Sequence, residues 1–357
     1  AAGRLWEAIL IEAPRDLLAL KLAHFAHFYL GELAQHRDSP ARVMHAWDEK
    51  VPGYGYVLGM RAFGLEEAGD YGPAERFGRR AVELNPRDIW AVHAVAHVME
   101  MQGRHREGLA WVDLHADAWG PNAHNFQYHL WWHQALYHLE RGAHAAVIDL
   151  YDTRYRADQS DDYLDISNAA AMLMRLELRQ VAVGARWQEL AEKAALHRHD
   201  HILPFADAHY MLCLVGAGRH AQAGEMLASM RRYAAERSGT MPPIMRGVGI
   251  PLGEAILAWG RKDYGAVVET LMPIRYDLIR IGGSHAQRDI FWQMLIGAAL
   301  RGERYAIARG LLAERVAAKP RSPQAWAWYG EALQGAGDAA GAARARGEAD
   351  FRLRGRP

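Results

Sequence analysis

The sequence predicts an all-α fold, an α-solenoid or superhelix of about nine helical hairpins, and two adjacent stretches of the chain carry this prediction. They span residues 55–88 and 89–122, and small or turn-forming residues recur at matching positions in both. The first contains Ala62, Gly69, Tyr71, Ala74, Ala81 and Pro86. The second contains Ala96, Gly103, His105 and Gly108. This is the pattern of a tetratricopeptide repeat, in which two helices pack closely through small residues and the chain turns at a glycine.

The same pattern continues along the chain and predicts a single superhelical domain over residues 1–357. Five further hairpins keep a recognisable spacing, at 128–160, 204–240, 248–282, 289–322 and 323–356. Two irregular hairpins are expected at 5–50 and 161–200. An array of this length can curl far enough to bring its ends together, so we expect the concave groove to enclose a central pocket.

Local signals set the limits of several elements. One long helix is expected over residues 5–35, and Ser39–Pro40 is expected to begin a second helix that ends near Lys50. Extra residues at 123–127 precede the fourth hairpin and predict a loop on one rim of the array. Gly69 and Gly103 fall at hairpin turns, where we expect little room for a side chain.

The composition excludes several classes of partner and cofactor. Lys and Arg together number 42, as do Asp and Glu, so no net charge favours nucleic acid or an anionic membrane surface. No apolar run approaches about 18 residues, which predicts that the chain does not cross a membrane. The single cysteine, Cys213, lies in an apolar run and fits a reducing, cytoplasmic location. No glycine-rich phosphate loop is present, so no nucleotide cofactor is expected.

Imidazole and aromatic side chains gather at the positions that face the concave groove in this kind of repeat. These groove residues are Tyr56, Trp90, His93, His97, Glu100, His129, Trp132 and His133. Two adjacent helices each carry histidines four residues apart, a spacing at which both imidazoles can reach one metal ion. The candidate ligands of a divalent metal such as zinc are His93, His97, His129 and His133. The metalloprotease pattern His-Glu-x-x-His is absent, so a metal-free polar pocket and structural hydrogen bonding remain alternatives.

Two later segments also carry polar side chains at helical spacing. Asp165 and Asn168 share one face of an otherwise apolar helix, where buried polar groups need partners. A second set stands at the start of a predicted helix: His285, Gln287, Arg288 and Asp289. The first turn of that helix can present free N–H groups to an anion, with Arg288 as a further donor. An ordinary capping box formed by Ser284 and Gln287 is compatible with the same residues.

Several of these stretches are also the basis of a family resemblance. Residues 59–67, 90–103, 132–136, 165–171 and 282–289 resemble, in this order, segments of the tetratricopeptide repeat protein 38 family. The resemblance covers nearly the whole chain and implies a helical-repeat fold, but it implies no particular activity. It further implies that the following are family-motif positions: His93, His97, Glu100, His133, Asp165, Asn168, His285, Gln287, Arg288 and Asp289. One departure occurs before Arg175, where Met174 replaces an expected Trp.

Two functional hypotheses follow from these residues. The favoured one is a small-molecule-binding and enzymatic pocket, with hydrolase-type or other acid–base chemistry. In it His97 or His93 is the general base or a metal ligand, Glu100 orients it, and His285 or Asp289 is the acid. The expected substrate-binding residues are Tyr56, Trp90, His129, Trp132, His133, Asp165, Asn168, Gln287 and Arg288. The alternative is a scaffold that binds a protein or peptide partner in its groove without catalysis.

Overall fold

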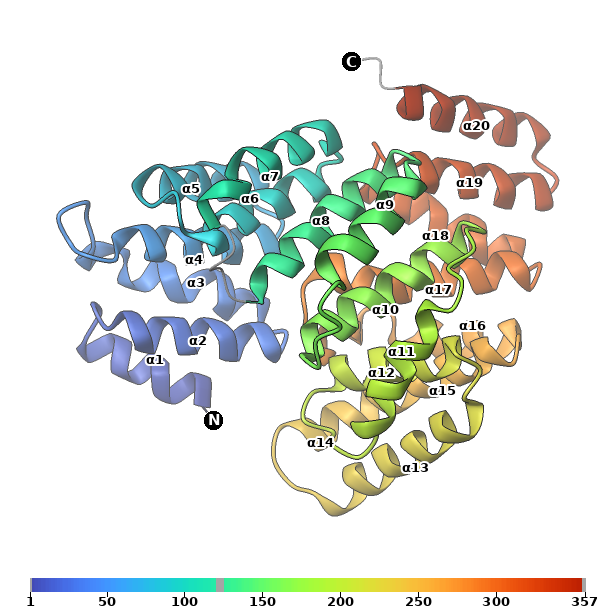
Figure 1. The fold of residues 1–357 in the computed structure, drawn as a ribbon, viewed down its shortest axis with the longest axis horizontal. Helices are drawn as coiled ribbons and strands as arrows, with labels where there is room; N and C mark the ends of the chain where they lie inside the picture. Colours follow the sequence, from blue (N-terminus) through green and yellow to red (C-terminus); the bar gives the residue numbers. More distant parts are fainter. Residues whose placement is uncertain (1, 120–124, 355–357) are drawn as a thin grey trace. The chain divides into compact units, whose positions relative to one another are not determined.

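The computed structural model describes residues 2–119 and 125–354, and within these ranges every regular element is a helix (Figure 1). This confirms the all-α prediction. The helices form two compact units. Within the described residues, unit 1 comprises the chain up to Gln134 together with Gly282–Ala286, and unit 2 comprises Ala135–Ile281 and the chain from Gln287 onward. The prediction that both belong to one curled superhelix stays a prediction.

Unit 1 is a succession of helices, and the α-helices up to residue 119 each pack on the next one along the chain. They are α1 (Ala2–Glu12), α2 (Leu17–Tyr29), α3 (Leu33–Val43), η1 (Met44–Ala46), α4 (Tyr54–Glu67), α5 (Tyr71–Leu84), α6 (Ile89–Met101), α7 (His105–Trp119) and the first part of α8 (Phe126–Glu140). Helix α4 packs against both α5 and α6, and α6 packs against α7. This is the repeated contact pattern of stacked helical hairpins.

Unit 2 continues the same scheme. Its helices are the remainder of α8, α9 (His144–Leu150), η2 (Tyr151–Tyr155), α10 (Tyr163–Leu178), α11 (Arg186–Leu196), α12 (Pro204–Gly216), α13 (His220–Glu236), α14 (Met241–Ile244), η3 (Met245–Gly249), α15 (Ile250–Gly260), α16 (Tyr264–Ile274), η4 (Asp277–Ile281), α17 (His285–Arg301, from Gln287 onward), α18 (Tyr305–Ala318), α19 (Pro323–Gly335) and α20 (Ala339–Arg354). The predicted irregular hairpin at 161–200 is the pair α10 and α11.

The small and turn residues of the repeat pattern lie where they are expected, although the reason expected for one turn glycine does not hold. Ala62, Ala74 and Ala81 are at most 1% exposed, which lets neighbouring helices approach closely. Gly69 and Gly103 separate the two helices of a hairpin and have φ of 86° and 67°. The expected lack of room is wrong for Gly69, since a Cβ there would meet nothing within 4 Å in the described part of the chain. The turn needs glycine because L side chains rarely adopt a positive φ.

Two predictions about the first hairpin are wrong. Residues 5–35 form two helices and the start of a third. The first helix ends before Pro14, and the second begins at Leu17. Asp16 caps the second helix by accepting a hydrogen bond from the Ala19 N–H. Ser39–Pro40 does not begin a helix, since Pro40 lies inside α3. Both residues are buried in unit 1, and this packing outweighs the backbone hydrogen bond that proline cannot donate.

The predicted rim insertion at 123–127 lies partly outside the described residues, which resume at Asn125, and α8 already begins at Phe126. The predicted ends of two repeats, at 122 and 356, also lie outside the described ranges.

Cys213 is buried in α12, where burial raises the pKa of its thiol far above the usual range. None of the described helices has the length and apolar character needed to cross a lipid bilayer.

Candidate metal centre

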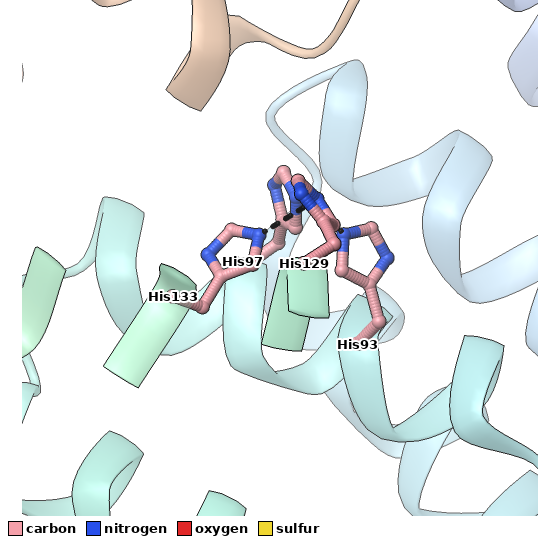
Figure 2. A group of neighbouring side chains, drawn as sticks. All are labelled: His93, His97, His129 and His133. Carbon is pink, nitrogen blue, oxygen red and sulfur yellow. Dashed lines mark hydrogen bonds between the residues drawn. The ribbon is translucent and has the colours of Figure 1, made fainter. Parts of the chain in front are cut away.

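Helices α6 and α8 each place two histidines on one face. Helix α6 begins after Asp88, whose side chain accepts hydrogen bonds from the backbone N–H groups of Trp90 and Ala91. The four-residue spacing in both helices then directs the imidazoles of each pair to the same side. Figure 2 shows the four rings converging on one small volume of unit 1.

The distances within this histidine cluster, made of His93, His97, His129 and His133, are those of a ligand set. The Nε2 atom of His129 lies 3.0 Å from Nε2 of His93 and 3.2 Å from Nε2 of His133 (Figure 2). One nitrogen from each of the four rings lies within 4.8 Å of all the others. Around a tetrahedral zinc ion with typical Zn–N distances, the ligand nitrogens are separated by about 3.3 Å. The cluster therefore has nearly the spacing that one ion requires.

The four imidazoles are buried, and two of them have ring nitrogens that make no hydrogen bond in the described structure. Their exposed fractions are 3% for His93, 0% for His97, 2% for His129 and 0% for His133. Burial and the neighbouring imidazoles lower the pKa of His93 and His97 well below the usual value, so both rings are neutral. In the described structure, neither ring nitrogen of His97 has a hydrogen-bond partner. The Nδ1 atom of His93 has none either. Neutral imidazole is the form that binds metal, and an ion in the cluster would satisfy one of the two ring nitrogens of His97.

Carboxylates stand behind two of the rings. Glu100 places an oxygen 3.5 Å from Nδ1 of His133, and Glu66 places one 3.4 Å from Nδ1 of His97. A carboxylate on the outer nitrogen of a histidine ligand fixes the tautomer and increases the basicity of the inner nitrogen. The sequence predicted Glu100 as an orienting residue but missed Glu66. The signal was available, since Glu66 has the same place in the repeat 55–88 as Glu100 has in 89–122.

A second group shares His97 with the cluster. It consists of Glu66, Glu67, His97 and His285, whose candidate ligand atoms also lie within 4.8 Å of one another. The Nε2 atom of His285 is 2.7 Å from a Glu66 oxygen, and the His285 backbone N–H donates to the Glu67 carboxylate at 3.2 Å. The His285 side chain is 21% exposed, whereas both carboxylates are nearly inaccessible. The structure thus brings predicted His285 to the cluster.

Aromatic rings enclose the cluster. Phe63 of α4 has its ring centre 5.2 Å from that of His93 and 5.4 Å from that of His97. Trp132 stacks on His129 at 5.2 Å and is fully buried. Predicted substrate residue Trp132 is therefore part of the wall, and the histidines lie in the interior of unit 1 instead of along an open groove. Tyr56 and Trp90 line a separate cavity of the same unit.

The remaining predicted residues belong to unit 2, namely Asp165, Asn168, Gln287, Arg288 and Asp289. There the Gln287 side-chain amide donates to the Asn168 oxygen at 3.2 Å. Arg315 donates to both oxygens of Asp289, at 2.7 and 2.9 Å. Burial by itself would raise the pKa of Asp289, but Arg315 holds it well below the usual range. A carboxylate held ionised in this way is a poor proton donor, and the role of Asp289 as an acid stays a prediction.

Comparison with known proteins gives only distant structural similarities. No protein-family model matches the chain. Its structure is similar to chains of the APC/C hetero-tetramer Cut9-Hcn1 (14% identity, TM-score 0.32, 98% of this chain covered), yeast Tom70 (12%, 0.28, 93%) and Naa15/Naa10 bound to HypK-THB (12%, 0.25, 99%). It spans 65%, 91% and 64% of those chains. The chain has a tetratricopeptide-repeat-like fold. That assignment depends on its own helices and turn glycines.

Proposed function

We propose that this protein is a helical-repeat binding scaffold whose first unit is held together by one divalent transition-metal ion, with zinc the best fit. The histidine cluster would supply four imidazole ligands from α6 and α8. The observation that carries the proposal is the convergence of the Nε2 atoms of His93, His129 and His133 at 3.0 and 3.2 Å in a buried interior. Imidazole suits zinc, copper and nickel, and zinc accepts a tetrahedral set of four protein ligands.

Closure of the site supports a structural role for this ion. Catalytic zinc sites keep one position open for water or substrate, whereas structural sites use four protein ligands. Here the four candidate ligands are at most 3% exposed. An ion bound by all four would link α6 directly to α8. The chain connects these two helices only by way of α7. The buried carboxylates of Glu66 and Glu100 would offset its charge.

The scaffold part of the proposal derives from the repeat fold. Stacked helical hairpins present extended surfaces, and proteins built from them typically bind other proteins or peptides. We therefore expect a protein or peptide partner. The resemblance of several segments to the tetratricopeptide repeat protein 38 family supports this assignment, and we propose membership of that family on the same ground.

An enzymatic, small-molecule-binding role is a second candidate, and one observation favours it. His285 pairs with Glu66 at 2.7 Å and keeps a fifth of its side chain accessible, so this imidazole could exchange a proton with a bound substrate. In that case the group formed by Glu66, Glu67, His97 and His285 would be the reactive part of the site, with hydrolase-type chemistry.

Thermal unfolding of protein stripped with EDTA and reloaded with zinc tests the proposal. Zinc at about 100 times its Kd should stabilise the wild type by about 2.7 kcal/mol. His93→Ala should lose this stabilisation, and His209→Gln should retain it, because His209 is equally buried but lies in unit 2. The enzymatic candidate predicts in addition that zinc-loaded protein hydrolyses p-nitrophenyl acetate and that His285→Ala does not. No zinc-dependent stabilisation of the wild type would contradict the structural-metal proposal.

A further inference from the structure

Unit 1 contains a cavity of about 520 Å³ whose position and chemistry differ from those of the histidine cluster. Residues of α2, α4 and α6 and of the segments next to them form its wall. Its apolar wall is formed chiefly by Leu17, Leu18, Tyr56, Met60, Phe63 and Trp90. Three polar residues, Lys21, His24 and Asp88, complete it. Sites for small molecules have this size and this composition of an apolar wall with few polar groups.

Among the described residues of this wall, Lys21 is the only cation. Its Nζ atom lies over two aromatic rings, 3.9 Å from the ring centre of Trp90 and 4.2 Å from that of Phe25. Within the described ranges no acceptor binds the three N–H groups of this ammonium. Burial lowers the pKa of Lys21 to about 8, so most of it is protonated at neutral pH. An ammonium that contacts aromatic rings but has no hydrogen-bond acceptor is less well stabilised than it would be in water.

The other two polar residues do not neutralise this charge directly. The Asp88 carboxylate accepts from the N-terminal N–H groups of α6 and forms no ion pair with Lys21. His24 is 3% exposed and its Nε2 lies 3.1 Å from Nε2 of His36. Burial lowers the pKa of His24 well below the usual value, so the ring is neutral. Its Nδ1 has no partner among the described residues and offers a further hydrogen-bonding position.

We propose that this cavity binds a hydrophobic monocarboxylate, such as a medium-chain fatty acid or an arylalkanoic acid. The carboxylate would pair with the ammonium of Lys21, and the apolar body would pack against Tyr56, Met60 and Trp90. This inference goes beyond the proposed metal and scaffold functions and uses none of the metal ligands.

The charges in the wall favour this ligand over other classes. The described wall contains one lysine and no arginine, which suits a singly charged anion, whereas a phosphate would call for more donors. The start of α6 is not available to an anion, because the Asp88 side chain already accepts its N–H groups. A cationic ligand is disfavoured because Lys21 itself occupies the faces of Trp90 and Phe25.

Isothermal titration of the full chain with three ligands of equal chain length tests this inference. Decanoate should bind the wild type at least about tenfold more tightly than decanol, and decyltrimethylammonium should bind most weakly. Lys21→Met preserves the length of the side chain without its charge and should remove the preference for decanoate over decanol. Lys50→Met, a matched change at an exposed lysine, should leave it intact.

A second pair of variants covers the case in which Lys21→Met does not fold. Leu18 is 69% exposed at the rim of the cavity, so charge there is tolerated. Leu18→Glu should weaken decanoate binding several-fold while Leu18→Gln does not. Equal affinity of the wild type for decanoate and decanol, or no binding of either, would overturn the proposal whatever the variants do.

Discussion

The Nε2 atoms of His93 and His129 lie 3.0 Å apart, although 36 residues separate these histidines in the chain. They belong to different helices, and both are almost completely buried. Either a hydrogen bond between two neutral rings or a shared metal ion can account for this distance. The other two imidazoles of the cluster make the shared ion the better explanation. Hydrogen bonds between the rings leave His97 without a partner in the described structure, whereas one ion can bind a nitrogen of each ring.

Glu100→Gln should weaken zinc binding without abolishing it. The Glu100 carboxylate lies 3.5 Å from the outer nitrogen of His133, and a neutral amide cannot increase the basicity of that ring to the same extent. We expect the affinity to fall about 10- to 100-fold, as measured by competition with a chelating dye. Glu107→Gln, a change at an exposed ion pair of α7, is the control. Equal affinities of the wild type and Glu100→Gln would mean that this carboxylate does not support a ligand.

His97→Ala should destabilise even the metal-free protein. The His97 ring is 0% exposed and lies against Phe63, His93 and His133, so its removal leaves a cavity. A loss of about 1–3 kcal/mol is expected from urea unfolding in the presence of EDTA. His45→Ala, at an exposed position, should change the stability by less than about 0.5 kcal/mol. A groove-facing His97 would instead tolerate the change, and an unaltered midpoint would therefore argue against burial.

Gly64→Ala and Gly69→Ala should differ in cost, because the two glycines serve different purposes. A Cβ at Gly64 would lie 2.5 Å from the carbonyl oxygen of His36, which belongs to the backbone of α3. A Cβ at Gly69 meets nothing within the described structure, and the cost there comes only from φ of 86°. We expect a loss of about 1 kcal/mol for Gly69→Ala and about 3 kcal/mol for Gly64→Ala in chemical denaturation. The reverse order would contradict the packing of α4 on α3.

Asp165→Asn should change how stability depends on pH. The Asp165 side chain is buried in unit 2, and burial raises its pKa to about 7. Between about pH 4 and 7 the folded state therefore binds more protons than the unfolded chain, so the free energy of unfolding falls as pH rises. The variant removes this loss, and its stability relative to the wild type should be about 2–3 kcal/mol greater at pH 8 than at pH 5.

Asp161→Asn provides the control for this pH series. The Asp161 carboxylate is exposed and pairs with Lys193, which lowers its pKa instead of raising it. The free energies of unfolding of both variants and of the wild type are measured from unfolding curves between pH 5 and 8. A relative stability of Asp165→Asn that stays constant over this range would show that Asp165 ionises as easily in the folded state as in the unfolded chain.

Periodic features of the sequence predicted the fold and the proximity of the four histidines of the cluster. The 34-residue spacing located the turns at Gly69 and Gly103, and the four-residue spacing placed His93 with His97 and His129 with His133. The packing of the two pairs against each other followed from the adjacency of their hairpins. These predictions succeeded because they depend on positions close together in the chain or one repeat apart.

Long-range contacts could not be predicted in the same way. His285 reaches Glu66 across 219 residues, and no local pattern relates the two. Arg315 pairs with Asp289 from another helix, and the segment around Asp289 contains no sign of this partner. Pro40 lies inside α3 because packing outweighs the local preference, and the environment of Lys21 depends on rings from two helices.

Elemental analysis by plasma mass spectrometry tests the metal centre most directly. The full chain would be stripped with EDTA, loaded with zinc, separated from free metal by gel filtration, and compared with His129→Ala and with His209→Gln. His129 is the central ring of the cluster, with contacts to both His93 and His133, whereas His209 is a buried histidine of unit 2. We predict about one zinc ion per chain in the wild type and in His209→Gln, and almost none in His129→Ala. A wild-type protein that retains no zinc, or a His129→Ala variant that retains as much as the wild type, would contradict the assignment of this cluster as a metal site.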